Sequence, residues 1–180
     1  MDQATKLLGR AKAGDEVAFD QLVESVTPRL YRTVRRMSSD RMEAEAIVQE
    51  TWLRAWKALN RVDTDRPVMP WLTTIAVNLA RDQWRKSQRL QVEAEPKSVW
   101  ESAVSRPAEK MMLQRDKAQQ LADYVSQLRP EYRAVIALRY EAGLSYEEIS
   151  EALSTPINTV RTHLRRAKLA LRQRMEPENG

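Results

Sequence analysis

The chain of 180 residues contains no cysteine, one histidine and four glycines. The absence of cysteine excludes disulfides, thiol nucleophiles and cysteine-ligated metal sites, and His163 alone cannot build a zinc site. Charged residues make up 31% of the chain and interrupt every apolar stretch, so no membrane-spanning helix is expected. The first residues have no apolar core, which predicts no secretory signal. These absences predict a cytoplasmic protein without membrane insertion, catalytic residues, bound metal or cofactor.

The net charge of +5 is distributed unevenly along the chain. Residues 1–92 hold 16 basic and 12 acidic groups, residues 93–107 are acidic and contain two prolines, and a second basic segment follows. A proline-containing stretch without apolar periodicity is typical of a linker. We therefore expect a helical domain at 1–92, a flexible linker at 93–107 and a second helical domain at 108–176.

Apolar residues on both sides of this linker recur at helical spacing, and no alternation of β-branched residues predicts a strand. The expected fold is all-α. Asp15 is placed to cap one helix, and Asp40 with Glu43 resembles a capping box for the next. Further helices are expected at about 2–13, 40–59, 70–89, 108–127, 130–142, 145–153 and 156–174. The apolar series of the helix at 40–59 places Leu53 and Trp56 toward the core.

Residues 143–164 carry the most specific local pattern. Ser145 and Glu148 form an S-x-x-E capping box, and a tight connection follows at Ser154. Thr155 is then expected as the N-cap and Pro156 as the first residue of a second helix. Apolar residues on the two helices, namely Ile149, Leu153, Val160 and Leu164, are in register to face each other. This pattern is typical of a helix-turn-helix, whose second helix is presented to the major groove of DNA.

The second helix of this motif carries a stripe of side chains suited to base edges. Asn158, Arg161, Thr162 and Arg165 lie at i, i+3, i+4 and i+7. Arginine can read guanine through two hydrogen bonds and asparagine can read adenine. Arg166 and Lys168 are better placed for phosphate contacts, which position the helix without reading sequence. The sequence therefore predicts a duplex DNA interface at Asn158, Arg161, Thr162, Arg165, Arg166 and Lys168.

The helix expected at 70–89 carries a different mixture. Trp71, Asn78, Arg81 and Arg85 lie near one stripe, which combines an aromatic ring, an amide and cations. Such a surface suits single-stranded nucleic acid, because bases stack on rings while phosphates meet arginine. Tryptophan at helical spacing is more often a core residue, and we expect Trp52 or Trp56 to be one.

Together these segments resemble the extracytoplasmic-function sigma factors of bacterial RNA polymerase. The resemblance is carried by the 44–57 segment with Gln49 and Glu50, the 70–86 segment from Trp71 to Asn78, the 128–135 segment, and the helix with Thr159, Val160 and Arg161. They occur in the family's order and spacing over nearly the whole chain. The resemblance implies a promoter-melting domain followed by a helix-turn-helix domain.

The family also implies roles for individual positions and partners. The helix with Glu45, Gln49, Glu50 and Arg54 would dock on a coiled coil of the RNA polymerase core. The loop 60–69, with Asn78 and Arg81, would capture a flipped base of the minus-ten element, and in this chain Met69, Val68 or Asn60 is left to line its pocket. The helix-turn-helix would read the minus-thirty-five element of promoter DNA. An inhibitory anti-sigma factor is a further implied partner.

Several positions depart from the family's pattern. Ala46 stands where an acidic residue is usual, Ser150 and Ser154 stand where alanine and glycine are common, and the loop 60–69 has no aromatic residue. A positive φ at Ser154 would place strain on the turn.

Two other functions compete with this interpretation. A conventional helix-turn-helix regulator, acting without being a polymerase subunit, would use residues 144–166 in the same way. A metal-dependent nuclease could begin its site at Asp63 and Asp65, but companion ligands at useful spacing are missing.

Overall fold

The computed structural model describes residues 3–93 and 117–175. These residues form α1 (Gln3–Lys12), α2 (Glu16–Met37), α3 (Arg41–Ala58), the short 3-10 helix η1 (Leu59–Arg61), α4 (Val68–Glu93), α5 (Lys117–Ser126), α6 (Pro130–Ile136), the π-helical turn η2 (Ala137–Glu141), α7 (Tyr146–Leu153) and α8 (Ile157–Met175). No strand occurs in the described ranges, and the all-α prediction is confirmed. Nearly all of the 93–107 segment lies outside the described residues, including Trp100.

Of the N-terminal helices α1–α4, α2 and α3 begin where their capping residues predict. Asp15 accepts a 2.9 Å hydrogen bond from the amide of Ala18 at the start of α2. Asp40 accepts one of 2.8 Å from the amide of Glu43 at the start of α3. The Glu43 carboxylate reaches back to the amide of Ser39 at 2.6 Å, one residue before the Asp40 amide of a capping box. These bonds satisfy amides that a helix leaves unpaired at its N-terminus.

The core of these four helices is built from aliphatic side chains with one tryptophan at its edge. Phe19 contacts the rings of Trp52 and Trp56 edge to face, at centroid distances of 5.9 and 4.7 Å. Trp52 is buried and donates its indole N–H to the Thr27 hydroxyl at 2.9 Å. The largest fully buried side chains of this core are Leu8, Leu22, Leu30, Val34, Ile47, Val68 and Leu72.

The segment expected as one helix at 130–142 is α6 followed by the π turn η2. The amide of Ala142 donates to the carbonyl of Ala137 at 3.1 Å, five residues back, which defines the wider turn. Gly143 follows with φ of +67°, a backbone conformation that glycine adopts without steric cost. The π turn was not predicted, because apolar periodicity does not distinguish it from an α-helical turn.

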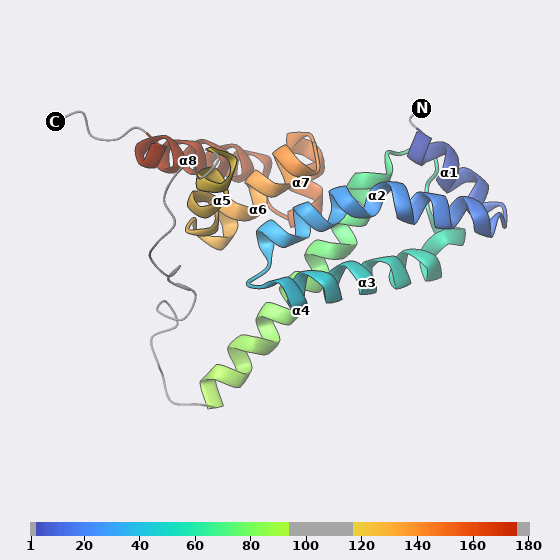
Figure 1. Cartoon of the computed structure of the whole chain (residues 1–180), viewed down its shortest axis with the longest axis horizontal. Helices are drawn as coiled ribbons and strands as arrows, with labels where there is room; N and C mark the ends of the chain where they lie inside the picture. Colours follow the sequence, from blue (N-terminus) through green and yellow to red (C-terminus); the bar gives the residue numbers. More distant parts are fainter. Residues whose placement is uncertain (1–2, 94–116, 176–180) are drawn as a thin grey trace.

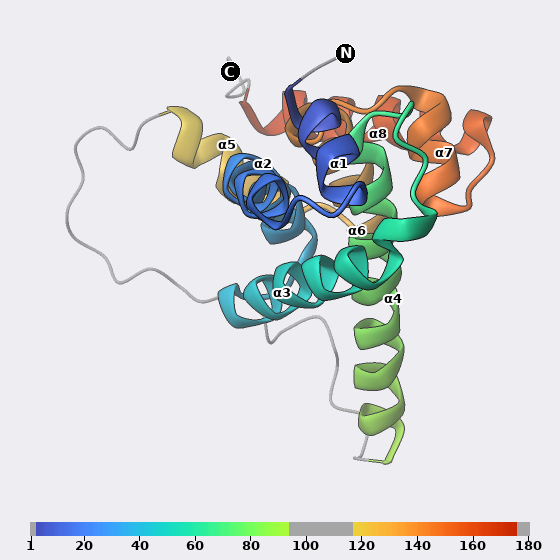
Figure 2. The same ribbon diagram turned by 90° about the vertical axis from the view of Figure 1, so that its right-hand side faces the viewer.

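The C-terminal helices lie against α2 and the first half of α4. Figures 1 and 2 show α6 and α7 beside these two helices, while the second half of α4 extends beyond the rest of the molecule. Buried residues of both groups join in one apolar cluster. The sequence held no signal for this arrangement. Among the helices that the structure describes, none is long and apolar enough to cross a membrane.

Candidate nucleic-acid interface

The helix-turn-helix has the predicted capping box. The Ser145 hydroxyl accepts from the Glu148 amide at 3.1 Å, and the Glu148 carboxylate accepts from the Ser145 amide at 2.7 Å. Ile149, Val160 and Leu164 are buried between α7 and α8 as expected. Leu153 is only half-buried, and Ala152 occupies the buried position in its place.

The turn between α7 and α8 differs from its prediction in one detail. Ser154 has φ of +48° and ψ of +46°, so the left-handed conformation falls on a residue with a Cβ. The Pro156 carbonyl accepts the first helical bonds, from the amides of Thr159 and Val160, so α8 begins one residue later than predicted, at Ile157. The hydroxyl of Thr155, the predicted N-cap, donates to the Leu153 carbonyl at 3.1 Å within the turn.

The predicted duplex-reading residues share the solvent-facing side of α8. All of them are exposed, namely Asn158, Arg161, Thr162, Arg165, Arg166 and Lys168. Thr162 donates to the Asn158 carbonyl at 2.9 Å, and an Arg161 nitrogen lies 3.5 Å from the Asn158 side-chain oxygen. Their polar groups are therefore free to face a partner, with only weak local bonds to exchange.

Two tyrosines that the sequence analysis missed hold some of these cations in place. The Arg139 and Arg161 guanidinium groups lie 5.2 and 6.0 Å from the centre of the Tyr146 ring. The Lys168 ammonium lies 5.7 Å from the Tyr140 ring, and a hydrogen bond with that tyrosine raises the pKa of Lys168. A cation over an aromatic face is held by the ring's negative potential. In the sequence, only the spacing of these tyrosines from the basic residues of α8 could have indicated the contacts between the rings and the cations.

The predicted strand-binding residues do not all come together. Asn78 and Arg85 are exposed on α4, while Arg81 and Trp71 are half-buried on the same helix. Arg81 donates to the Leu153 carbonyl at the end of α7. Met69 is buried at the start of α4, where it lines a cavity of about 460 Å³, and Asn60 lies exposed on η1.

The cavity beside Met69 is bounded by both groups of helices. Pro67 and Pro70 line it from the loop and α4, and Gly143 and Leu144 line it from the chain that precedes α7. Val68 and Met69 thus border the space next to the helix-turn-helix, whereas Asn60 does not line this cavity.

The predicted docking residues form an exposed row on α3. Glu45 pairs with Arg41 at 2.7 Å and Glu50 pairs with Arg54 at 2.9 Å, both one helical turn apart, and Gln49 is exposed.

Apolar side chains lie among these charged residues. Met42, Leu53 and Trp56 are 80%, 55% and 47% exposed. The prediction that Leu53 and Trp56 face the core is wrong. Trp52 and Ala55 take the inward positions, because the buried side of α3 is rotated relative to the series chosen from the sequence. An apolar row on an exposed helix is typical of a protein-binding surface.

The remaining candidates do not assemble a metal site. The Asp63 carboxylate accepts from the Asp65 amide at 3.0 Å and pairs with Arg66 at 3.5 Å. In the described part of the chain, no three acidic, histidine or cysteine side chains are grouped so that they could hold a metal ion. His163 packs edge to face on Tyr132 with ring centres 5.5 Å apart.

The fold and the exposed basic face of α8 define a helix-turn-helix DNA-binding protein. Residues 22–90 match the family of sigma-70 region 2, and residues 118–171 match that of sigma-70 region 4. The chain belongs to the sigma-70 family and is a sigma factor of the extracytoplasmic-function (ECF) type. It therefore binds RNA polymerase and promoter DNA as a non-catalytic subunit of the polymerase.

Relatives of known function match the chain over almost its full length. The ECF RNA polymerase sigma factor SigW of Bacillus subtilis is 31% identical over 94% of this chain and 95% of its own. The RNA polymerase sigma-H factor of Pseudomonas aeruginosa is 29% identical over 98% and 95%.

Solved structures also resemble the chain. The sigma factor RpoE in complex with the anti-sigma factor NepR, from Bartonella quintana, is 26% identical and gives a TM-score of 0.73 over 89% of this chain and 98% of that one. CnrH in complex with the cytosolic domain of CnrY gives 0.67 at 26% identity, over 97% of both chains.

Proposed function

We propose that this sigma factor opens its promoter by capturing a flipped base of the minus-ten element on the surface around α4. One observation carries the proposal. Asn78, Arg81 and Arg85 lie at three- and four-residue spacing on α4, and Met69 lines a cavity at the start of that helix. An amide that can pair with a base edge and cations that can meet phosphates suit an unpaired strand.

Base capture explains how DNA can melt without ATP. Flipping a base costs a few kcal/mol, and binding of the separated strand draws the melting equilibrium toward the open state. Residues 3–93 would serve as the melting domain. The residues with a direct role are Asn60, Met69, Trp71, Asn78, Arg81 and Arg85.

The exposed face of α8 would read the minus-thirty-five element as duplex. Asn158, Arg161, Thr162 and Arg165 are placed to reach base edges, while Arg166 and Lys168 would contact phosphates. The row on α3 would dock on the polymerase core through Glu45, Gln49, Glu50 and Arg54, with Leu53 and Trp56 supplying apolar contact. Because Ala46 is neutral, the acidic side chains of this row are those of Glu45 and Glu50.

An anti-sigma factor would control the protein in the cytoplasm. The proposal is supported by the resemblance to RpoE and CnrH, both of which were solved as complexes. A surface for such a partner is available among the C-terminal helices, where a cavity of about 680 Å³ is lined by Leu121, Val125, Ile136, Tyr140, Leu171 and Met175. Arg36, Lys168 and Arg172 also line it, together with Glu141, which pairs with Arg36. The excess of basic groups suits an amphipathic helix with acidic residues.

The strand-capture proposal is tested by replacing Asn78 and Arg81 with alanine. Permanganate reactivity of unpaired thymines in the holoenzyme complex should fall about tenfold or more, because each lost base contact weakens strand binding. Binding of an upstream-element duplex to the same protein should be unchanged. Asp82→Ala, an exposed change on the same helix, is the control. Normal melting by the double variant would refute the role of these residues.

A further inference from the structure

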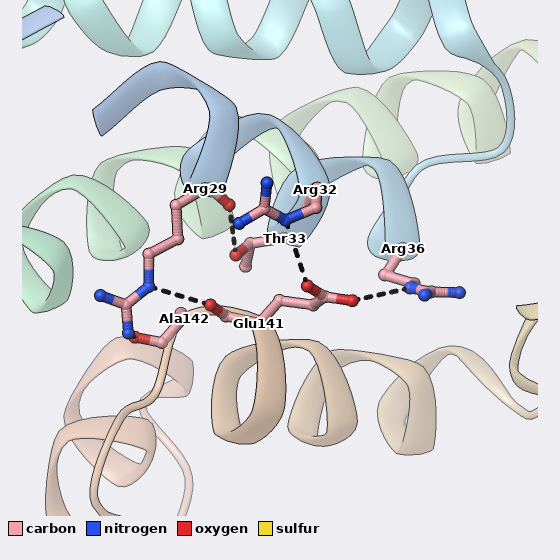
Figure 3. A network of polar contacts seen from close by, with 6 residues as sticks. All are labelled: Arg29, Arg32, Thr33, Arg36, Glu141 and Ala142. Atoms are coloured by element: carbon pink, nitrogen blue, oxygen red, sulfur yellow. Dashed lines mark hydrogen bonds and ion pairs between the residues drawn. The ribbon is translucent and has the colours of Figure 1, made fainter. Parts of the chain in front are cut away.

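Glu141, at the end of η2, lies between two arginines of α2. Its carboxylate oxygens lie 3.2 Å from Nε of Arg36 and 3.5 Å from Nε of Arg32, as Figure 3 shows. The Glu141 side chain is 24% exposed, against 32% and 59% for Arg36 and Arg32. This acidic group of the C-terminal helices is therefore held by cations of the N-terminal helices.

A third arginine of α2 contacts the backbone next to Glu141. Arg29 donates to the carbonyl oxygens of Glu141 and Ala142 at 3.0 and 2.8 Å. Arg29, Arg32 and Arg36 are spaced at i, i+3 and i+7, so they share one face of the helix. Both carbonyls come at the end of the π turn, where a helix carries partial negative charge.

Gly143 gives Arg29 the room for this contact. A methyl group at position 143 would overlap the guanidinium of Arg29, and the positive φ of Gly143 is one that residues with a Cβ rarely adopt. The ion pairs of Glu141, the hydrogen bonds of Arg29 to the backbone and the glycine thus form one set of contacts. We call this set the latch and define it as Arg29, Arg32, Arg36, Glu141 and Gly143.

The closed arrangement engages part of the surface assigned to the opened strand, while Asn78 and Arg85 stay exposed on α4. Arg81 is engaged with the Leu153 carbonyl at the end of α7. Met69 and Pro70 line a cavity whose other wall includes Gly143 and Leu144. In contrast, the duplex-reading side chains of α8, among them Asn158, Arg161 and Arg165, remain exposed.

We infer that the free protein holds itself closed through this latch, and that the C-terminal helices mask the part of the strand-capture surface at Arg81 and Met69 until the two groups of helices separate. The masking rests on the strand-capture function proposed above, whereas the latch does not. Partly exposed ion pairs are individually weak and screened by salt, so the latch can open when polymerase or a DNA strand binds. Strand affinity is then reduced by the fraction of molecules that are closed.

The latch can be measured directly in the full chain. Because the chain has no cysteine, spin labels can be placed specifically at Asp20→Cys on α2 and Gln173→Cys on α8, both exposed positions. Glu141→Arg should lengthen and broaden the distance distribution between the labels. Glu131→Arg makes the same change of charge at an exposed position of α6, and it should leave the distance distribution unchanged. Adding Arg32→Glu and Arg36→Glu to Glu141→Arg should restore the short distance. An unchanged distance in Glu141→Arg would overturn the latch.

The masking is measured by the anisotropy of a labelled single-stranded minus-ten oligonucleotide. Relative to the Glu131→Arg control, Glu141→Arg should bind it about 3- to 30-fold tighter, since opening restores the competent fraction. Arg81→Ala added to Glu141→Arg should remove that gain, because Arg81 is the side chain that opening releases from the Leu153 carbonyl. If the labels separate but strand binding does not tighten, the latch stands and the strand-capture function fails. A gain that survives Arg81→Ala would overturn the masking of that side chain.

Discussion

The Ser150 hydroxyl donates a 2.6 Å hydrogen bond to the Thr155 carbonyl across the turn of the helix-turn-helix. The amide of Thr155 donates in return to the Ser150 carbonyl at 3.0 Å. The two serines that depart from the family's pattern therefore have different consequences. Ser150 adds a hydrogen bond across the turn, whereas Ser154 adopts a left-handed backbone conformation, which is disfavoured for a residue with a Cβ.

Ser154→Gly should stabilise the protein. A residue with a Cβ is disfavoured at φ of +48°, and glycine removes that penalty while losing more entropy on folding. The net gain in the free energy of unfolding should be about 0.5–1 kcal/mol, measured by urea denaturation. A Ser154→Ala variant is the control and should gain nothing. Equal stability of the glycine variant and the native protein would contradict strain at this turn.

Ser150→Ala should have the opposite effect. Removing the hydroxyl leaves the Thr155 carbonyl without its bond from this side chain, and a hydrogen bond of this kind contributes about 0.5–1.5 kcal/mol. The same urea measurement checks the change. Ser126→Ala, which removes a bond to the Asp123 carbonyl on exposed α5, should cost less. A loss no larger than that of Ser126→Ala would show that the turn does not depend on Ser150.

Arg165→Ala and Arg166→Ala should weaken upstream-element binding in different ways. If Arg165 contacts a base, its loss should cost about 1–3 kcal/mol on the preferred sequence and relax specificity there. Loss of Arg166, a phosphate contact, should weaken binding to all sequences alike and reduce the salt slope by about one. Titration of matched and mutated duplexes at several salt concentrations separates the two. Identical behaviour of the variants would remove the distinction between reading and positioning.

Leu53→Asp should weaken binding to polymerase core without destabilising the protein. The side chain is 55% exposed in the row of α3, so an aspartate there is solvated in the free chain. Burying that aspartate against the polymerase should reduce affinity roughly tenfold, because apolar anchors contribute strongly to interfaces. Val17→Asp, on α2 and 62% exposed, is the control. Unchanged core affinity with native thermal stability would exclude Leu53 from docking.

Asp15→Asn should lose stability only above acidic pH. The amide of Ala18 and the Arg10 guanidinium lower the pKa of Asp15 below its ordinary value of 3.8. A carboxylate whose pKa is lowered by folding stabilises the folded state at pH values above its unfolded-state pKa. This stabilisation is lost as the pH falls through the folded-state pKa. The melting temperature of Asp15→Asn should therefore lie below that of the native protein at neutral pH and converge with it once the pH falls below the folded-state pKa of Asp15. Asp20→Asn should show no such difference. A constant gap at all pH values would contradict the charge effect.

The sequence predicted local structure most accurately where side chains contact the backbone close to them. The Asp15 cap, the Ser145–Glu148 box and the buried Ile149 and Val160 all follow from neighbours within a few residues. The order of motifs also indicated the family, which the region 2 and region 4 matches confirm. The roles of individual DNA-binding residues stay predictions.

Other features depended on contacts between distant segments. The rotation of α3, which exposes Leu53 and Trp56, is decided by the packing of Trp52 between Phe19 and Thr27. The π turn at η2 has no periodic signature. Neither could be obtained from hydrophobic spacing, because that spacing describes one helix and not its neighbours.

The sequence by itself determined that this is an all-α protein without cysteine chemistry, with a basic helix-turn-helix and the motifs of an ECF sigma factor. Only the tertiary structure decided which arginines meet Glu141, and that Arg81 reaches Leu153 rather than lying open on α4. Helix caps depend on residues a few positions apart, and their geometry follows from the chain. Contacts over a hundred residues depend on how whole helices pack, and weak ion pairs between them leave no pattern in the sequence.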